Sequence, residues 1–461
     1  MRDGQVGALA VLAVTAAWGA ASGRASAVAA VLLVALLAGA IAGRNFGVAA
    51  GLATVLLVGG VAVHSARAWH DARPRTVGPF DGWVTLVDDP APIRSATAVV
   101  LQVEGERFQV FAYGSPGRRL ARLHAGDVVH VSGRRGPLSG SNRRRAVVRH
   151  VVGEIDVDTV GDVAPGTPVA RASNRVRALL RDGASATMAG EDAALFTGLV
   201  IGDDTRQSPT VVDEFRRAGL SHLTAVSGQN VAFVLAVAGI LLRRLSRWWR
   251  LTATLALIAW FAALTRLEPS VLRAGVMAGL SALSFALGRD RSPARLLALA
   301  VVILVLIDPF LMWSVAFWLS TGATVGVTVL APLIEPRMRG PAWLVPAVAV
   351  TVGAQLGVVL PSWLVFHRLP ALGLVANLLA VPVAGFVMLV GIPTALLAAV
   401  VPHAVAVTIM VPARLGTRWV AVVARLAAAL EPRGAAAAVL WMSQAALIAG
   451  SCVRRRTNTM H

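Results

Sequence analysis

The 461-residue sequence contains no lysine and a single cysteine, Cys452. One thiol excludes a disulfide within the chain and any metal site built from several cysteines. P-loop, HExxH, zinc-ligand and paired-carboxylate patterns are also missing, so we identify no ATPase or metal-hydrolase motif and expect no cofactor. The first apolar run begins almost at once and further runs follow closely, which is not the pattern of a cleavable signal peptide.

All 43 basic residues are arginines, against 24 acidic residues, which gives a net charge of +19. One interpretation is a GC-rich genome combined with arginine-rich loops on one side of a membrane. The other is a protein that handles a polyanion, because basic surfaces attract phosphate backbones. Composition alone leaves both open.

Apolar residues make up 56% of the chain, and its mean hydropathy is +0.69. With several uninterrupted apolar runs, this predicts a polytopic α-helical membrane protein. Three short apolar segments predict three transmembrane helices within residues 1–66. Apolar runs return over residues 170–456, together with amphipathic helices, and predict a second transmembrane domain.

Between these regions, residues 79–162 have a different sequence pattern. Five short runs are β-branched or alternate with period two, and turn residues separate them. They predict a small inserted β-barrel, with the oligonucleotide-binding (OB) fold as the leading candidate.

Arginine placement predicts the orientation of the chain. The arginine-rich stretches 243–250, 289–295 and 337–339 are each two spans apart, and the turns at 268–269 and 308–309 between them are poor in arginine. The positive-inside rule therefore places the three stretches in the cytoplasm and the β-domain outside it.

Two regions are harder to place. Arginines at near-helical spacing over 170–186, including Arg177 and Arg181, predict an amphipathic helix on the membrane face. Residues 371–400 are long for one span and contain two prolines, and 405–430 fits either a span or an interfacial segment. The number of crossings after residue 360 therefore stays open.

The richest polar stretch, residues 198–231, lies between apparent membrane spans. Polar groups at membrane depth are functional candidates, and the Ser227-Gly228 pair predicts an interrupted helix. Ser208-Pro209 predicts a helix start, Gly219 a helix end, and Asp213 an ion pair with Arg217. The candidate residues of this stretch are Asp203, Arg206, Arg216, Arg217, His222, Ser227, Gly228, Gln229 and Asn230.

Ser227 has three interpretations. It can be a small residue at a helix contact, a polar lining of a conduit or substrate site, or a nucleophile activated by His222. The last needs a broken helix, because the two residues lie about 140° apart on a continuous one. Further polar candidates are Glu268, Arg273, Asp308, Gln355 and Asn377, for which the alternatives are snorkelling, a turn, or interhelical hydrogen bonds.

In the β-domain, arginines accompany aromatic residues. This combination is typical of single-strand binding, where cations follow phosphates and rings stack on bases. The alternative is that the rings fill the barrel core. The candidates for DNA contact are Trp83, Phe108, Tyr113, Arg118, Arg119, Arg134, Arg135, Arg143, Arg144 and Arg145.

The stretch FRRAGLSHLTAVSGQNV (215–231) resembles the signature FRxxGLxHLLAVSGLHV of the ComEC competence proteins. EPSVLRAGVMAG (268–279), DPFLMWSVAFWLSTGAT (308–324) and LPALGLVANLLAVPV (369–383) resemble the same family in the same order. The resemblance implies a non-enzymatic inner-membrane channel that carries single-stranded DNA into the cytoplasm during natural transformation. It implies that residues 170–456 form the channel and that the β-domain engages DNA.

The resemblance also has limits. Many members carry a metallo-β-lactamase-like domain, but this sequence contains no HxHxDH run, so the nuclease is expected to be a separate protein. The usual Leu-His after Ser-Gly is Gln229-Asn230 here. Other implied partners are membrane lipid, a DNA receptor, a cytoplasmic helicase or translocase, and further copies of the chain.

Two other classes of function stay open. A secondary transporter for an anionic small molecule or lipid head group would use the interrupted helix as its midplane site. It predicts inverted repeats, which we do not detect, and leaves the β-domain unexplained. An intramembrane serine hydrolase would use Ser227 and His222, and it predicts labelling of Ser227 by serine-reactive probes.

Overall fold

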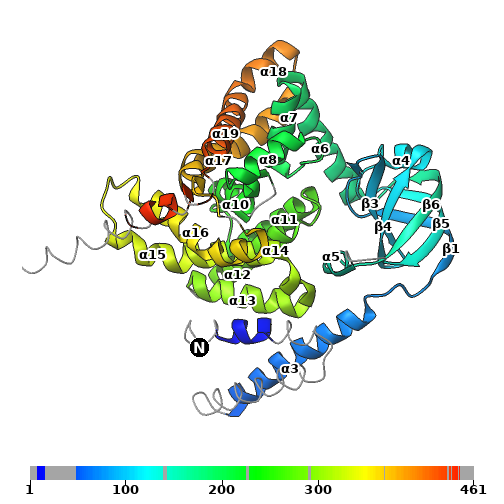
Figure 1. Ribbon diagram of the computed structural model, residues 1–461, viewed down its shortest axis with the longest axis horizontal. Helices are drawn as coiled ribbons and strands as arrows, with labels where there is room; N and C mark the ends of the chain where they lie inside the picture. Colours follow the sequence, from blue (N-terminus) through cyan, green and yellow to red (C-terminus); the bar gives the residue numbers. More distant parts are fainter. Residues whose placement is uncertain are drawn as a thin grey trace, which may run out of the picture. The chain divides into compact units, whose positions relative to one another are not determined.

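We describe the chain from a computed structural model (Figure 1). The described residues are 8–15, 48–138, 143–224, 228–288, 292–367, 369–432, 434, 436–437, 439–444 and 446. They divide into two units, one formed by residues 1–175 with 298–314 and the other by residues 176–297 with 315–461. Each unit is described by itself.

The first unit begins with helical residues 8–15 and helix α3, Val48–Asp71, which covers the third predicted N-terminal span. Most of the first two predicted spans lies outside the described residues. The β-domain follows, with six strands and two short helices. They are β1 Gly78–Leu86, β2 Ala91–Ile93, β3 Ala96–Val103, β4 Glu106–Tyr113, α4 Gly114–Leu120, β5 Val128–Pro137, α5 Arg143–Val148 and β6 Val151–Ala164.

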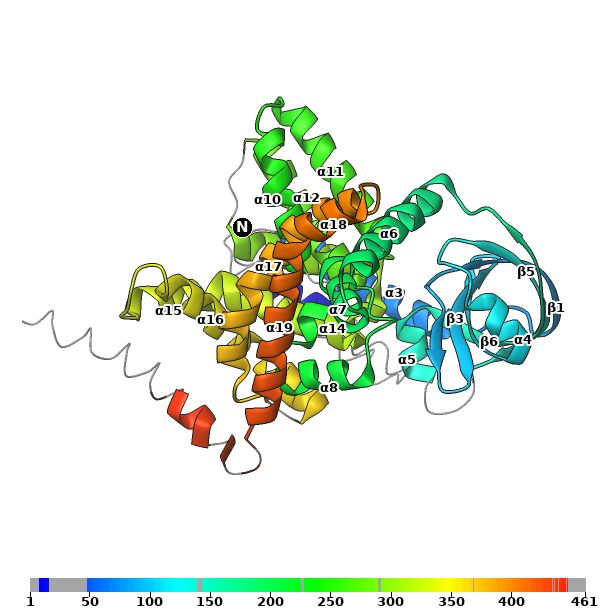
Figure 2. The same cartoon turned by 90° about the horizontal axis from the view of Figure 1, so that it is seen from above.

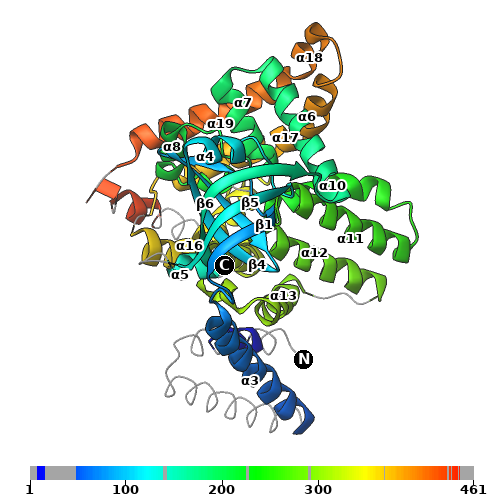
Figure 3. The same ribbon diagram turned by 90° about the vertical axis from the view of Figure 1, so that its right-hand side faces the viewer.

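The strands of the β-domain follow the order β1-β5-β6-β4-β3-β2. Figure 3 shows β6, β5 and β1 side by side. β1 also pairs with β3, so five of the strands form a closed cycle of hydrogen-bonded neighbours. β4 and β6 run parallel, and the other neighbouring pairs are antiparallel. The domain thus contains the predicted sheet, and its bounds are within a few residues of those predicted.

Side chains alternate along β4 as a half-buried strand requires. Phe108, Val110 and Ala112 are buried, whereas Phe111 and Tyr113 face outward. The inward set packs with residues of the other four strands of the cycle into one apolar core. The period-two pattern of the sequence therefore reflects strands that bury one face in the core of the β-domain.

The remaining part of the first unit packs against α3 and α5. A 3-10 helix, Pro309–Trp313, places Phe310 and Trp313 edge-on to Trp69 of α3, at ring-centroid distances of 5.2 and 5.8 Å. Phe310 shares a small apolar cluster with Val147 of α5. This segment therefore packs against elements flanking and within the β-domain.

The second unit is helical, with α6 and α13 divided between the two units. Its helices are α6 Pro168–Thr187, α7 Gly190–Ile201, α8 Pro209–Arg217, α9 Ser221–Thr224, α10 Gly228–Leu242, α11 Arg247–Leu264, α12 Pro269–Ala286, α13 Pro293–Ile307, α14 Val315–Val325, α15 Ala331–Ile334, α16 Val345–Phe366, α17 Gly373–Ala398, α18 His403–Ile409 and α19 Val411–Leu430. One π-helical turn, Gly326–Leu330, joins α14 to α15.

Three helical stretches of the described residues are long and apolar enough to cross a membrane: Val315–Arg337, Val345–Phe366 and Gly373–Ala398. They support the predicted membrane protein. The region 371–400 contains one helix, α17, despite Pro382 and Pro393. α18 and α19 meet at a 52° bend, so they form either a fourth, broken span or a re-entrant segment.

Glycines set the closest helix contacts of the second unit. A Cβ on Gly326 would lie 2.0 Å from the carbonyl oxygen of Gly353, and one on Gly322 would lie 2.3 Å from that of Gly357. These two GxxxG pairs let the backbones of α14 and α16 touch. Gly275 and Gly279 of α12 face Ile258 and Leu255 of α11.

Small residues also line α17 where it packs against α19 and α7. Figure 2 shows α17 and α19 side by side, and both contribute alanines to the core. Gly391 of α17 faces the ring of Phe196 of α7, which is fully buried. This packing fixes α7, and with it the loop that carries the polar stretch.

Candidate functional site

Helix α8 has the ends that its sequence predicted. The Ser208 hydroxyl accepts a hydrogen bond from the Val211 N–H (3.3 Å), and Pro209 occupies the first helical position. Gly219 has φ 72°, which favours glycine after a helix end. Arg217 pairs with Asp213 at 2.9 Å, as the spacing predicted. Arg206 and Arg216 are exposed.

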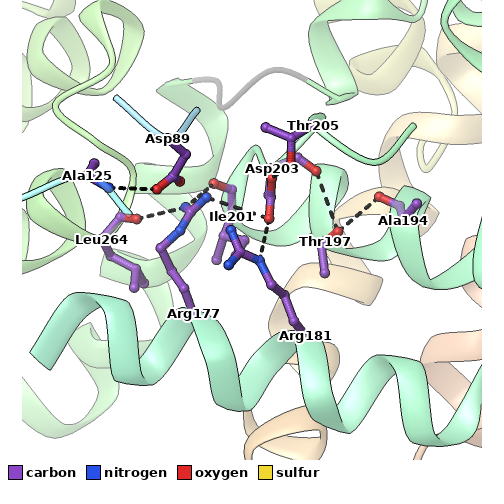
Figure 4. A network of polar contacts seen from close by, with 10 residues as sticks. All are labelled: Asp89, Ala125, Arg177, Arg181, Ala194, Thr197, Ile201, Asp203, Thr205 and Leu264. Atoms are coloured by element: carbon purple, nitrogen blue, oxygen red, sulfur yellow. Dashed lines mark hydrogen bonds and ion pairs between the residues drawn. The ribbon is translucent and has the colours of Figure 1, made fainter. Parts of the chain in front are cut away.

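Before α8, Gly202 ends α7 in the left-handed conformation (φ 66°) and turns Asp203 back into the protein. Only 2% of Asp203 is exposed. Its carboxylate accepts hydrogen bonds from Arg181 Nε at 2.6 Å and from the Thr205 hydroxyl at 2.7 Å (Figure 4). Arg177 Nη2 lies 3.7 Å from the same carboxylate.

Arg177 also donates hydrogen bonds to carbonyl oxygens at the ends of two helices. Its Nη1 donates to the carbonyl oxygens of Ile201, the last residue of α7, and Leu264, the last residue of α11, at 3.4 and 3.1 Å. Such carbonyls lack an intrahelical donor, and a cation there is favoured by the helix dipole. The prediction that Arg177 and Arg181 of α6 face the membrane surface is wrong, because both contribute to this network and Arg177 is 3% exposed.

The network shifts the acidity of Asp203, which lies outside the candidate spans. Burial raises the pKa of Asp203, but the positive charges of Arg181 and Arg177 lower it by more. The pKa of Asp203 therefore lies below its ordinary value. The carboxylate therefore stays ionised and holds its two arginines. For the neighbouring Asp204, burial together with the charge of Asp203 raises the pKa.

The interruption predicted at Ser227-Gly228 falls next to residues 225–227, which lie outside the described part of the chain, so it stays a prediction. α9, which carries His222, ends at Thr224, and α10 begins at Gly228. Ser227 lies outside the described residues, so a Ser227–His222 pair stays a prediction. Asn230 is 8% exposed, and its Nδ2 lies 3.5 Å from the Leu199 carbonyl oxygen of α7, whereas Gln229 is half-buried.

Two of the motifs meet at the start of α10. A Cβ on Gly228 would lie 3.1 Å from the Cβ of Ala274 on α12. Next to this contact, Arg273 is buried (5% exposed), and its Nη2 donates to the Ala316 carbonyl oxygen of α14 at 3.0 Å. Arg273 therefore does not snorkel outward. Glu268 is exposed at the N-terminal end of α12.

The motif 215–231 also meets the motif 369–383, at Gly219. A Cβ there would lie 3.2 Å from Pro370 and 3.6 Å from the Cα of Gly373. Gln355 of α16 extends to the same place, 3.4 Å from the Cβ position of Gly373. Asn377 donates to the Gly373 carbonyl oxygen at 2.7 Å, within its own helix, and this bond is not interhelical.

Asp308 belongs to the first unit. Its carboxylate lies 3.0 Å from Nε2 of His150, which follows α5, and it also caps the 3-10 helix by accepting from the Phe310 N–H. Its contacts are therefore with the β-domain side of the first unit.

The β-domain candidates separate into outward and inward residues. Phe108 is fully buried, and Arg135 is 9% exposed, with its guanidinium 4.1 Å from the Phe80 ring centroid and hydrogen-bonded to Thr76. Phe108 therefore cannot stack on a base, which corrects that prediction, whereas Arg135 lines the groove described below. Trp83, which contacts His130 edge-on, and Tyr113 are exposed.

The other arginines of the β-domain are on its surface. Exposed side chains include Arg118 and Arg119 of α4, Arg134 of β5, and Arg143, Arg144 and Arg145 of α5. Arg119 donates to the Val160 carbonyl oxygen, and Arg144 lies over the Trp313 ring at 5.4 Å.

An open groove of about 680 Å³ crosses β4, β5 and β6. Phe111, Tyr113 and Arg134 line it together with Gln109, Glu154 and Asp156. Phe111 lies an odd number of residues from Phe108 and therefore on the opposite face of β4. Among the described residues, no cluster of three or more histidines or carboxylates that could hold a metal is present.

Residues that sequence reasoning missed include Glu431. Its carboxylate accepts from the N–H groups of Ala371 and Leu372, at 2.6 and 3.0 Å, just before α17 begins. The only signal was an isolated acid in an apolar region, and its partners are 59 and 60 residues away in the sequence.

With the geometry established, comparison with known proteins identifies the family. The Competence protein family model matches residues 199–456, which is more than half of the chain and contains all four motifs in full. The chain belongs to the competence protein family. This confirms the resemblance stated from the motifs.

Two curated relatives support the assignment to the competence protein family. The chain is 29% identical over 229 residues to the uncharacterized protein YcaI of Escherichia coli (strain K12), covering 46% of this chain and 29% of the relative. It is 28% identical over 205 residues to ComE operon protein 3 of Bacillus subtilis (strain 168), covering 44% of this chain and 26% of the relative. The match thus spans less than a third of either relative. No solved structure matches.

In this competence protein, Asp203→Asn is expected to destabilise the second unit. The variant leaves two arginines near a neutral amide, and breaking a buried ion pair typically costs about 3–5 kcal/mol. We expect a lower thermal unfolding temperature of the full chain in detergent, followed by tryptophan fluorescence. The matched control is Asp204→Asn, at the neighbouring position, which is more exposed than Asp203. Equal unfolding temperatures for the two variants would contradict a stabilising role of the Asp203 network.

The same network predicts a pH dependence. Because the folded-state pKa of Asp203 is below the ordinary 3.8, its ionisation stabilises the fold fully above that value. The contribution is lost as the pH falls through the folded-state pKa. Unfolding is measured at a series of pH values from neutral to about 3. We expect acid to lower the stability of Asp203→Asn by less than it lowers the stability of the parent chain.

Proposed function

We propose that this chain forms an inner-membrane channel that carries single-stranded DNA into the cytoplasm during natural transformation. Membership of the competence protein family carries the proposal. In this proposal the helical unit provides the conduit and the β-domain, outside the cytoplasm, engages the strand. The chain works as a channel and not as an enzyme, alongside a DNA receptor, a cytoplasmic helicase or translocase and a nuclease, and it can assemble with further copies of itself.

The β-domain supports this proposal by its strand pairing. Five strands in a closed cycle, with β4 parallel to β6 and a helix between β4 and β5, agree with an OB-like barrel. OB folds bind oligonucleotides across the face of their second and third strands, which correspond to β3 and β4 here. The outward rings of Phe111 and Tyr113 lie on this β4 face.

The groove offers the two kinds of contact that a single strand needs. Phe111 and Tyr113, exposed to 39% and 62%, present rings on which bases can stack. Arg134 provides a cation for the backbone, whereas Glu154 and Asp156 restrict where a phosphate can lie. We therefore propose that the strand crosses the groove from the rings of β4 to Arg134 of β5, with its phosphates kept clear of Glu154 and Asp156.

Removing a groove ring is expected to weaken single-strand binding. Tyr113→Ala in the full chain should lower the affinity for a fluorescent thymidine oligonucleotide about 5- to 100-fold, since stacking contributes roughly 1–3 kcal/mol per base. Tyr113→Phe keeps the ring and should bind as the parent does. Fluorescence anisotropy at several salt concentrations measures both. If the alanine and phenylalanine variants bind equally well, the groove is not the DNA site.

Uptake by a deletion strain tests the function as a whole. In a transformable host lacking this gene, labelled DNA is expected to reach the outer face of the inner membrane but not the cytoplasm, because the conduit is missing. Complementation with the parent gene should restore cytoplasmic label, measured after removal of external DNA.

Unchanged cytoplasmic entry in the deletion strain would contradict the channel and favour the transporter for small anions. Complementation by Ser227→Ala serves as the control for the hydrolase. Substantial uptake is expected from this variant, and complete loss with normal folding would favour catalysis by Ser227.

A further inference from the structure

The apolar part of α3 ends at Val63. The sequence from Phe46 to Val63 contains no charged residue, and as a helix it would extend about 27 Å, close to the roughly 30 Å of a hydrocarbon core. His64 and Arg67 follow, and Trp69 lies about 9 Å beyond Val63 along the helix. Head groups add roughly 5–8 Å on each side of the core. With α3 as the third predicted span, Trp69 therefore lies near the outer edge of the head-group layer.

A second apolar helix ends at the same aromatic residues. Residues 298–307 of α13, which belong to the first unit, are all apolar, and Asp308 follows them. The 3-10 helix Pro309–Trp313 then packs on the end of α3, with Trp313 edge-on to Trp69 at 5.8 Å between ring centroids. Tryptophan is enriched at membrane interfaces, where its ring meets both apolar and polar groups. These rings therefore mark the level of the membrane surface in the first unit.

Helix α5 of the β-domain lies at this level. Its buried residue Val147 shares an apolar cluster with Ala72, which follows α3, and with Phe310. The guanidinium carbon of Arg144, also on α5, lies 5.4 Å from the Trp313 ring centroid. These two contacts fix α5 beside the end of α3.

The exposed side of α5 is strongly basic. Residues 143–145 are three consecutive arginines, and all three are exposed. Asp88 pairs instead with Arg149, at 3.1 Å. Asp308 pairs with His150, at 3.0 Å. Within the part of the chain that the structure describes, no acid pairs with the three arginines, so their charge is available to a partner outside the protein.

We propose that the three arginines of α5, residues 143–145, bind the phosphate groups of anionic phospholipids and so hold the β-domain on the membrane surface. Basic side chains next to a membrane are attracted to anionic head groups, and a guanidinium binds a phosphate through two parallel donors. The contacts of Val147 and Arg144 keep α5 at the level of Trp69, where such phosphates lie.

Single-stranded DNA also offers phosphates, but α5 lacks the second kind of contact that a strand uses. Its sequence, RRRAVV, contains no aromatic side chain on which a base could stack. The groove provides two such rings, Phe111 and Tyr113, next to Arg134. We therefore assign the arginines of α5 to lipid and Arg134 to the strand.

Lipid preference is measured on the full chain in nanodiscs. With Cys452→Ser and Val148→Cys, a bimane label at the end of α5 is quenched by phosphatidylglycerol or by phosphatidylcholine, each carrying a nitroxide near the head group, at equal mole fractions. Each arginine near an anionic surface contributes about a fivefold preference. We therefore expect a relative affinity for phosphatidylglycerol of about tenfold or more, reduced by high salt. If the labelled chain unfolds early, His70→Cys, at a side chain 90% exposed on α3, takes the label instead.

The charge of α5 is then removed. Arg143→Gln combined with Arg145→Gln is expected to lower the relative affinity for phosphatidylglycerol at least about fivefold, because two of the three charges are lost. The matched control combines Arg118→Gln with Arg122→Gln, which removes two exposed arginines on and just after α4 and should keep the preference of the parent chain. Both double variants should unfold at the temperature of the parent chain, since all four side chains are exposed.

A lipid preference unchanged by Arg143→Gln with Arg145→Gln would overturn lipid binding at α5. The affinity of the same variant for a thymidine oligonucleotide, measured in detergent, would then show whether these arginines contact DNA instead. A lost lipid preference with retained oligonucleotide affinity supports the proposal. Because lipid preference is measured without DNA, either outcome is independent of the channel function.

Discussion

The position of the polar stretch depends on one buried carboxylate. Asp203 holds Arg181 and Arg177, and Arg177 in turn satisfies the last carbonyls of α7 and α11. Neither arginine could stay in these apolar surroundings without the negative charge, because the desolvation of an unpaired charge exceeds what a few carbonyl contacts return. The network thus fixes the end of α7, where the loop to α8 begins.

From that fixed loop, close glycine contacts bring the family's motif segments together. Gly228 places the start of α10 on α12, and Gly219 places the end of α8 on the segment before α17. Arg273 then extends from α12 to α14. Because glycine lacks a Cβ, these backbones approach more closely than other residues would permit. The motif segments of the second unit are neighbours for this reason.

The distribution of charge refines the interpretation of the net +19. Residues 78–164 carry eleven arginines and ten aspartates or glutamates, so the β-domain is nearly neutral although the whole chain is basic. Its arginines gather on α4 and α5, while β6 carries Glu154, Asp156, Asp158 and Asp162. A general attraction for polyanions therefore does not describe this domain, and contact with a strand must depend on where each phosphate lies.

Local patterns predicted local structure well. The Ser208 cap, the Asp213–Arg217 pair and the alternation along β4 each depend on residues a few positions apart, and each is present. The inward turn of Arg177 was not predictable, because its partners Asp203 and Leu264 are 26 and 87 residues away. Without them, an arginine-rich helix is expected at a membrane surface. Similarly, the sequence could not distinguish the buried Arg135 from the exposed Arg134 before the strand register was known.

The most direct measurement is site-specific crosslinking of DNA during uptake by living cells. A photoreactive benzoylphenylalanine replaces Gln229 at the start of α10, or Trp363, which is 56% exposed on α16, as the control. If the strand passes through the helical unit, labelled single-stranded DNA should crosslink at position 229 and not at 363. Cells that take up DNA through this protein without any crosslink at 229 would contradict the conduit described here.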